Sequence, residues 1–292
     1  MKTKAKTSNP LKWHGGKSYL ADWIISQMPP RCKNPNGPAP DDHGWLHYVE
    51  PFFGGGAVLF AQEPEGISEV VNDRNGDLTN FWHCLQTDEA FQEMRRILDG
   101  VAFAEHDWRF AGSVLDKGFI INSPSRAVAF FIRYRQSRQG LGKCFATLSR
   151  NRTRKGMNEQ ASAWLSAIEG LPEAHARLRG VVILNDDACK VIKQQDGPRT
   201  LFYCDPPYLH ETRHASATDA YEHEMTVEQH EELLKTLAGI AGRFLLSGYD
   251  SDLYHDFAQA HNWRCESKEI DNKSSGAKSK EKKREVLWTN YA

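Results

Sequence analysis

The chain has 292 residues, 40% of them hydrophobic, and a formal net charge of -1. This composition is typical of a globular protein, and the charge gives no overall sign of nucleic-acid binding. The six cysteines are scattered, and no Cys or Cys/His pair has metal spacing, so we expect neither a disulfide framework nor a metal site. No apolar stretch is long enough to cross a membrane, and no signal peptide is indicated, so we expect a cytoplasmic protein of a bacterial cell or a phage-infected host.

The first half of the chain alternates between predicted helices and strands. Apolar spacing and turn residues predict helices at 20–28, around 58–60 and at 77–98, strands at 47–50 and 69–72, and a loop at 31–44. The second half continues with helices at 161–178, 227–241 and 250–261, and strands at 181–184, 200–203, 244–247 and 286–288. We interpret the polar segments 210–224 and 272–283 as mobile loops. This alternation predicts an α/β fold with a parallel, doubly wound sheet.

Three of the predicted strands end in an acid or a glycine-rich turn. The first runs into Glu50-Pro51-Phe52-Phe53-Gly54-Gly55-Gly56, the second ends at Asp73, and the third is followed by Asp187. Ligands of doubly wound sheets bind outside the carboxyl ends of the strands. Glycines at such a position let a ligand approach the backbone closely. Asp73 is placed to accept hydrogen bonds from ribose hydroxyls, and Asp187 is placed to accept one from an adenine amino group. Each signal alone is more often a turn or a helix cap, but together they favour a ligand site.

The segment Asp205-Pro206-Pro207-Tyr208 follows another apolar strand. Because proline has no N–H group, the carbonyls here have no competing donor nearby. The Asp205 carboxylate and the Pro206 carbonyl are therefore suited to accept the two hydrogens of an exocyclic amine, and Tyr208 to stack on the ring that carries it. On these residues alone, a rigid turn with a packed tyrosine is an equally good interpretation.

A second glycine turn lies near the N-terminus, in Lys12-Trp13-His14-Gly15-Gly16-Lys17. Lys17 is suited to pair with a carboxylate and Trp13 to pack on a cofactor. The spacing is not that of a phosphate-binding Walker A loop, and the dinucleotide fingerprint G-x-G-x-x-G is absent as well. Alone, this turn is a weak signal.

Residues 126–155 form a local basic segment, with nine Lys and Arg residues, no acids and interleaved aromatic residues. Some of these cations are expected to contact DNA phosphates and others to read guanine edges, although a solvated basic helix face is the alternative. The candidates are Arg133, Arg135, Arg138, Lys143, Arg150, Arg152, Arg154 and Lys155.

Together, in this order, the two glycine turns, the acids at 73 and 187 and the Asp-Pro-Pro-Tyr segment resemble the DNA adenine N6-methyltransferases of the Dam-like D12 class (the alpha group). The resemblance implies a Rossmann-like methyltransferase domain, residues 1–99 and 181–292, with a mainly helical target-recognition region, residues 100–180, inserted into it. It also implies S-adenosylmethionine as cofactor, and double-stranded DNA as substrate.

The resemblance also assigns the site residues. Catalysis falls to Asp205, Pro206, Pro207 and Tyr208, and cofactor binding to Trp13, Gly15, Gly16, Lys17, Glu50, Pro51, Phe52, Gly54, Gly56, Asp73, Asp187 and Asp205. Two departures from the family stand out. The glycine triplet at 54–56 is richer than a cofactor loop needs, and the segment 210–224 is unusually rich in histidine, with His210, His214 and His223.

We therefore expect methyl transfer from S-adenosylmethionine to N6 of an adenine flipped out of the duplex, without a covalent enzyme intermediate. Methylation of cytosine N4 stays open as an alternative, because that nitrogen is also an exocyclic amine whose lone pair is delocalised into the ring. A catalytically inactive DNA-binding protein on the same fold is an alternative of a different class. We expect a monomer, which acts alone or beside a restriction endonuclease that recognises the same site.

Overall fold

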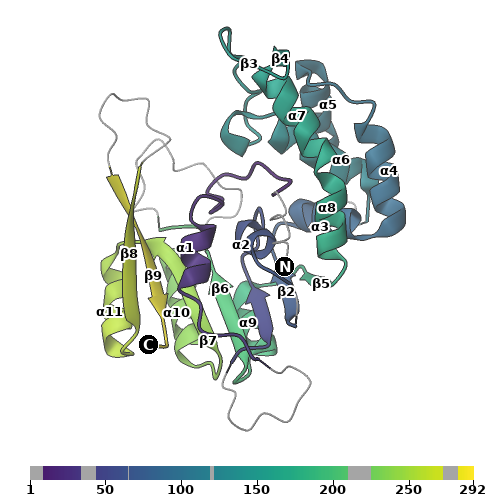
Figure 1. Cartoon of the computed structure of the whole chain (residues 1–292). Coiled ribbons are helices and arrows are strands. Elements are labelled where there is room, and N and C mark those ends of the chain that lie inside the picture. The colour runs from purple at the N-terminus through teal and green to yellow at the C-terminus, as the bar shows by residue number, and fades with distance from the viewer. Residues whose placement is uncertain (1–8, 34–43, 65, 119–121, 210–224, 272–281) are drawn as a thin grey trace. The chain divides into compact units, whose positions relative to one another are not determined.

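The computed structural model describes residues 9–33, 44–64, 66–118, 122–209, 225–271 and 282–292 (Figure 1). The chain divides into two compact units. The first comprises Met1–Gln27, Gly54–Glu65 and Asn75–Asn185, and the second comprises Met28–Phe53, Gly66–Arg74 and Asp186–Ala292. The predicted loop 210–224, with its three histidines, lies outside the described residues, and so do residues 272–281 of the predicted loop 272–283. The last two residues of that loop are instead the first two of strand β9.

The second unit is built on a sheet with the strand order β2-β1-β6-β7-β9-β8. Its strands are β1 (His47–Glu50), β2 (Ser68–Asn72), β6 (Thr200–Cys204), β7 (Arg243–Tyr249), β8 (Arg264–Asp271) and β9 (Lys282–Thr289), and its helices are α9 (Ala188–Gln195), α10 (Val227–Ala238) and α11 (Asp252–Ala260). Strands β2, β1, β6 and β7 are parallel, whereas β9 is antiparallel to β7 and β8 is antiparallel to β9 (Figure 1).

The centre of this sheet is fully buried. Every residue of β6 is buried, as a parallel strand covered on both faces should be. The helices begin at side chains that cap their free N–H groups: Thr226 and Gln229 form a capping box at α10, and Ser251 caps α11. The structure therefore has a mixed α/β fold with a mostly parallel central sheet, the fold class predicted above.

The first unit is mainly helical. Its helices are α1 (Ala21–Ser26), α2 (Ala57–Ala61), α3 (Gly76–Gln86), α4 (Asp88–Leu98), α5 (Glu105–Leu115), α6 (Pro124–Arg135), the 3-10 helix η1 (Arg138–Gly140), α7 (Glu159–Glu169) and α8 (Leu171–Leu178), and its strands are β3 (Thr153–Arg154), β4 (Met157–Asn158) and β5 (Val181–Leu184). Aromatic side chains form its core: Phe131 of α6 stacks on Phe81 of α3 at 5.7 Å between ring centroids and contacts Trp164 of α7 at 5.3 Å. The aromatic residues of the basic segment thus include buried core residues.

The structure corrects several sequence expectations. Residues 77–98 and 161–178 each form two helices, because Thr87 is extended between α3 and α4, and α8 begins at Leu171, directly after Gly170, with Pro172 in its first turn. The sheet is not wholly parallel, and strand β8 and helix α5 were not predicted from the sequence. Strand β8 lies at the sheet edge and is rich in charged residues, so the apolar pattern used to find strands is missing there.

Candidate active site

The carboxyl ends of the parallel strands in the second unit bring three predicted site residues to one edge of the sheet. Glu50, the last residue of β1, lies opposite Val71 of β2, one residue before the end of that strand. Asp73 follows β2 directly, and Asp205 follows β6, which pairs with β1 on its other side. Asp73 and Asp205 are half-buried, and Glu50 is buried. The edge therefore carries carboxylates, as the sequence predicted.

Asn72, to which the sequence analysis assigned no role, connects the turns at this edge. Its side-chain nitrogen donates to the Pro51 carbonyl at 2.9 Å and to the Asp186 carbonyl at 3.0 Å, and its side-chain oxygen accepts from the Asp186 N–H at 2.9 Å. Its backbone carbonyl accepts from the Phe53 N–H at 2.8 Å. One buried amide thus holds the turn after β1 and the segment that leads to Asp187. An amide directly before Asp73 at a strand end was the available sequence signal.

Asp187 caps helix α9. Its Oδ1 accepts a hydrogen bond from the backbone N–H of Lys190 at 3.1 Å, while the neighbouring Asp186 forms an ion pair with the Lys190 side chain. That ion pair lowers the pKa of the Asp186 carboxyl, chiefly through the hydrogen bond from Lys190. The Asp187 carboxylate is exposed and has a second oxygen, so its capping role is compatible with binding a ligand.

Residues 205–208, the Asp-Pro-Pro-Tyr turn, come directly after the buried strand β6. The Tyr208 hydroxyl lies 3.3 Å from Oδ1 of Asp205 and makes a short hydrogen bond to Oε1 of Glu285 on β9. Its ring meets the edge of Tyr249, at the end of β7, with 4.5 Å between ring centroids. The pKa of Tyr208 is raised well above its ordinary value by burial and then by the negative charges of Asp205 and Glu285. The hydroxyl therefore stays protonated and donates.

Two more tyrosines beneath this edge keep their protons. The Tyr48 hydroxyl donates to Oε1 of Glu50 at 2.8 Å, and the Tyr203 hydroxyl lies 3.1 Å from the Ser247 hydroxyl. Burial raises the pKa of both phenols well above 10.0, and the nearby carboxylates add to the shift. Glu50 is 2% exposed and so needs such a donor, because an unpaired carboxylate is costly to bury.

In the first unit, Trp13 of the N-terminal box packs against the glycine triplet. A Cβ atom on Gly55 would lie 2.8 Å from the Trp13 Cβ, and one on Gly54 would lie 3.1 Å from the indole nitrogen. Gly54 and Gly56 also have positive φ angles of 51° and 73°. All three glycines thus have a structural reason that is independent of a cofactor. The Trp13 ring also contacts Tyr134 of α6, at 4.9 Å between ring centroids.

The rest of the N-terminal box is a tight turn against the loop that follows α6. Gly15 has a φ of 75°, and the buried Lys17 donates to the Gly15 carbonyl at 3.3 Å. The Lys12 ammonium donates to the Ser137 carbonyl at 3.0 Å, and burial, followed by the charge of Arg135, lowers its pKa. The structure therefore brings the box, the glycine triplet and α6 together within this unit.

The predicted DNA-binding cations fall into two groups. Arg133 lies over the Trp108 ring at 3.7 Å, and Arg135 is half-buried. Burial lowers the pKa of both guanidinium groups. The other candidates are exposed: Arg138, Lys143, Arg150, Arg152, Arg154 and Lys155.

Three of the exposed cations belong to the hairpin of β3 and β4 or precede it directly. Thr153 pairs with Asn158 and Arg154 with Met157 across a two-residue loop. Lys155 and Gly156 in that loop have φ angles of 52° and 75°, as a type I′ turn requires. Within the described part of the chain this hairpin is thus an exposed basic ribbon, a shape that fits a DNA groove.

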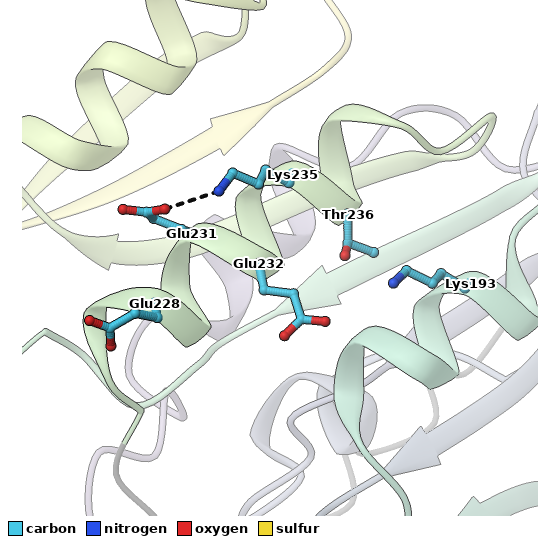
Figure 2. Close-up of a pocket in the computed structure, with 6 residues that line it drawn as sticks. All are labelled: Lys193, Glu228, Glu231, Glu232, Lys235 and Thr236. Atoms are coloured by element: carbon cyan, nitrogen blue, oxygen red, sulfur yellow. Dashed lines mark hydrogen bonds and ion pairs between the residues drawn. The ribbon is translucent and has the colours of Figure 1, made fainter.

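A separate cleft of about 450 Å³ lies on the surface of α10 beside α9. Figure 2 shows its charged lining, with Lys235 and Glu231 joined by a 3.0 Å ion pair. The remaining lining residues are Lys193, Glu228, Glu232 and Thr236. The cleft contains none of the predicted site residues and no aromatic ring on which a base could stack.

No helix in the described ranges is long and apolar enough to cross a membrane. Among the same residues, no three His, Cys, Asp or Glu side chains are grouped so as to hold a metal ion.

Comparison with known proteins identifies the family. The model of the D12 class N6 adenine-specific DNA methyltransferases matches residues 13–268. The type II methyltransferase M1.LlaDCHI of Lactococcus lactis subsp. cremoris is 25% identical over 96% of this chain and 94% of its own length. The type II methyltransferase M.MjaIII of Methanocaldococcus jannaschii is 35% identical over 27% of this chain and 25% of its own length. The family match covers most of the chain, which therefore belongs to the D12 class N6 adenine-specific DNA methyltransferases.

Proposed function

We propose that this DNA methyltransferase transfers a methyl group from S-adenosylmethionine to N6 of an adenine that has been flipped out of double-stranded DNA. The observation that carries the proposal is the Asp-Pro-Pro-Tyr turn. It places a carboxylate, a carbonyl without a neighbouring N–H and a tyrosine ring together after a buried strand, beside further carboxylates at the same sheet edge. Family membership supplies the reaction class.

The residues fit this cofactor by the chemistry of their donor and acceptor groups. Carboxylates at strand ends accept hydrogen bonds from ribose hydroxyls and from an adenine amino group, which are the roles proposed for Asp73 and Asp187. Further contacts with the cofactor are proposed for Glu50, Pro51 and Phe52. Cofactor contacts are also proposed for residues of the first unit, namely Trp13, Gly15, Gly16, Lys17, Gly54 and Gly56. When bound, S-adenosylmethionine supplies an electrophilic methyl group.

Asp205 and the Pro206 carbonyl act on the target amine. The lone pair of adenine N6 is delocalised into the ring, so the amine is a poor nucleophile. Acceptors for both N6 hydrogens favour a more tetrahedral nitrogen whose lone pair points away from the ring, ready to attack. Pro207 keeps the turn rigid. Tyr208 stacks on the flipped base and holds its plane.

Exposed cations of the first unit hold the DNA in this proposal. Base flipping requires the duplex to be held on either side of the target, and phosphate contacts position it without reading sequence. Arg150, Arg152, Arg154 and Lys155 are the strongest candidates, because they are exposed on or beside a β-ribbon. The other four candidates lie on α6, in the 3-10 helix η1 or in the loop after it: Arg133, Arg135, Arg138 and Lys143.

The direct test of the site is Asp205→Ala. The variant should lose methyl transfer by about a hundredfold or more, because the amine loses its charged acceptor. DNA affinity should stay close to that of the wild type, since the aspartate makes no phosphate contact. Transfer of a labelled methyl group and DNA binding by fluorescence anisotropy give the two readouts.

Glu231→Gln is the matched control, because it neutralises a partly exposed carboxylate of the same unit on α10. It should methylate DNA like the wild type. If Asp205→Ala retained activity, the catalytic assignment would be wrong. If the wild-type protein bound DNA and transferred no methyl group, it would be an inactive DNA-binding protein on this fold.

A further inference from the structure

Glu285 is a buried carboxylate beside the Asp-Pro-Pro-Tyr turn, and the reaction outlined above gives it no role. It lies on β9, opposite Tyr249 of β7, and is 1% exposed. The next residues of the strand, Val286 and Leu287, are buried apolar side chains. Burial of a carboxylate is costly unless hydrogen bonds compensate for the lost water, so a glutamate here must be held by strong donors.

The Tyr208 hydroxyl is such a donor, and it lies between two carboxylates. It makes a short hydrogen bond to Oε1 of Glu285 and lies 3.3 Å from Oδ1 of Asp205. A phenol has a single proton, so it donates fully to one of these carboxylates at a time. The contact to Glu285 is the closer of the two, so the proton is assigned to Glu285.

We propose that Glu285 is a positioning residue for methyl transfer: it accepts the Tyr208 hydroxyl, which fixes the ring for stacking and keeps the Asp205 oxygen for the amine of the target base. This inference rests on the proposed function, in which Asp205 and Tyr208 contact that base. The hydroxyl and the stacking face belong to the same rigid ring, so a hydrogen bond to the hydroxyl also fixes the orientation of that face.

Removal of the acceptor at position 285 has two consequences for the reaction. The Tyr208 proton turns to Asp205, where it competes with the amine hydrogens of the target base, and the ring loses one of its fixed ends. Both effects act after substrates have bound. The rate of methyl transfer should therefore fall, while the KM for S-adenosylmethionine and the affinity for DNA stay within about twofold of the wild type.

The experiment compares two substitutions in single-turnover methylation of DNA. Glu285→Leu keeps a similar volume and removes the acceptor, and it should slow transfer by about tenfold to a hundredfold. Glu285→Gln keeps an acceptor oxygen, and it should stay within about threefold of the wild type, because a neutral acceptor loses only part of the hydrogen-bond strength. Thermal unfolding checks that each variant is folded, and Glu285→Met is a second acceptor-free variant if the Leu variant is unstable.

A double-mutant cycle with Tyr208→Phe separates positioning from a structural role. Without the hydroxyl, Glu285 cannot fix the ring at position 208, so Glu285→Leu should cost less than about twofold in the Tyr208→Phe background. An equal loss in both backgrounds, or no loss in the wild-type background, would overturn the inference. Glu266→Gln on the neighbouring strand β8 should change nothing in either background. Failure of the wild-type protein to methylate DNA would instead overturn the proposed function.

Discussion

The Asn72 side chain hydrogen-bonds to three backbone groups, the Pro51 carbonyl and the carbonyl and N–H of Asp186. A single side chain therefore fixes the backbone beside Asp73 and Asp187. We predict that Asn72→Ala lowers the free energy of unfolding by about 2 kcal/mol, because it leaves the buried Pro51 carbonyl and its other partners without a hydrogen bond. It should also weaken binding of S-adenosylmethionine. Urea denaturation and isothermal titration calorimetry measure the two effects.

The control for this substitution is Asn151→Ala, which removes an exposed amide in the first unit. It should shift the unfolding free energy by less than about 0.5 kcal/mol. An Asn72→Ala variant as stable as this control would show that the turns hold their shape without the amide.

At the residue scale, the sequence revealed chemistry only where neighbours along the chain signal it. The Asp-Pro-Pro-Tyr turn was recognisable because two prolines, an acid and an aromatic ring are adjacent. Glu285 was not, because its partner Tyr208 is 77 residues away, and the two approach each other only because β7 pairs with β6 on one side and with β9 on the other. A single acid at the start of the apolar run 286–288 was the only signal.

At the element scale, the glycine triplet and the N-terminal box form one packed structure. We predict that Gly55→Ala lowers the melting temperature by several degrees and weakens S-adenosylmethionine binding, because the added Cβ would lie 2.8 Å from the Trp13 Cβ. Gly180→Ala is the matched control, since a Cβ there has no atom within 4 Å. Equal effects of the two substitutions on melting and binding would argue against the packing described.

The β3–β4 hairpin and the residues before it give the second prediction at this scale. Replacing Arg150, Arg152 and Arg154 together with glutamine should weaken DNA binding and flatten its dependence on salt. Each lost phosphate contact reduces the slope of log K against log salt by roughly 0.9. Anisotropy titrations at several salt concentrations measure this slope. The substitution should leave S-adenosylmethionine affinity unchanged.

Arg109→Gln is the control for the hairpin, because Arg109 is an exposed arginine of the same unit on α5, paired with Glu105. Its salt dependence should match that of the wild type. If the triple substitution reduced cofactor affinity and left DNA binding intact, the assignment of these arginines to DNA would be wrong.

The helix breaks show what apolar periodicity misses. The pattern continues from α3 into α4, yet Thr87 adopts an extended conformation between them, and acidic residues at 88 and 89 favour a new helix start. The short strands β3 and β4 were also not predicted, because two residues on each side of a turn give no alternation to detect. The strands that end at the candidate site residues were predicted well, because buried parallel strands are rich in apolar residues.

At the scale of the whole molecule, buried tyrosines should set the alkaline limit of stability. Tyr48, Tyr203 and Tyr208 have pKa values raised well above 10.0 in the folded state. Their contribution is fully present below pH 10 and is lost as the pH rises further, because only the unfolded chain can then release these protons. The unfolding free energy should fall above pH 10 by up to about 1.4 kcal/mol per pH unit for each tyrosine.

Urea midpoints at pH 8, 10 and 11 measure this loss, and Tyr48→Phe should make the decline above pH 10 less steep. A decline equally steep in the variant would show that other groups cause it.

The central claim is that this chain methylates adenine N6 in DNA, and its most direct test is the identity of the methylated nucleoside. Duplex DNA is incubated with the purified protein and S-adenosylmethionine, digested to nucleosides and analysed by mass spectrometry. The account predicts N6-methyldeoxyadenosine, formed by the wild type and absent with Asp205→Ala. N4-methyldeoxycytidine without N6-methyldeoxyadenosine would contradict it.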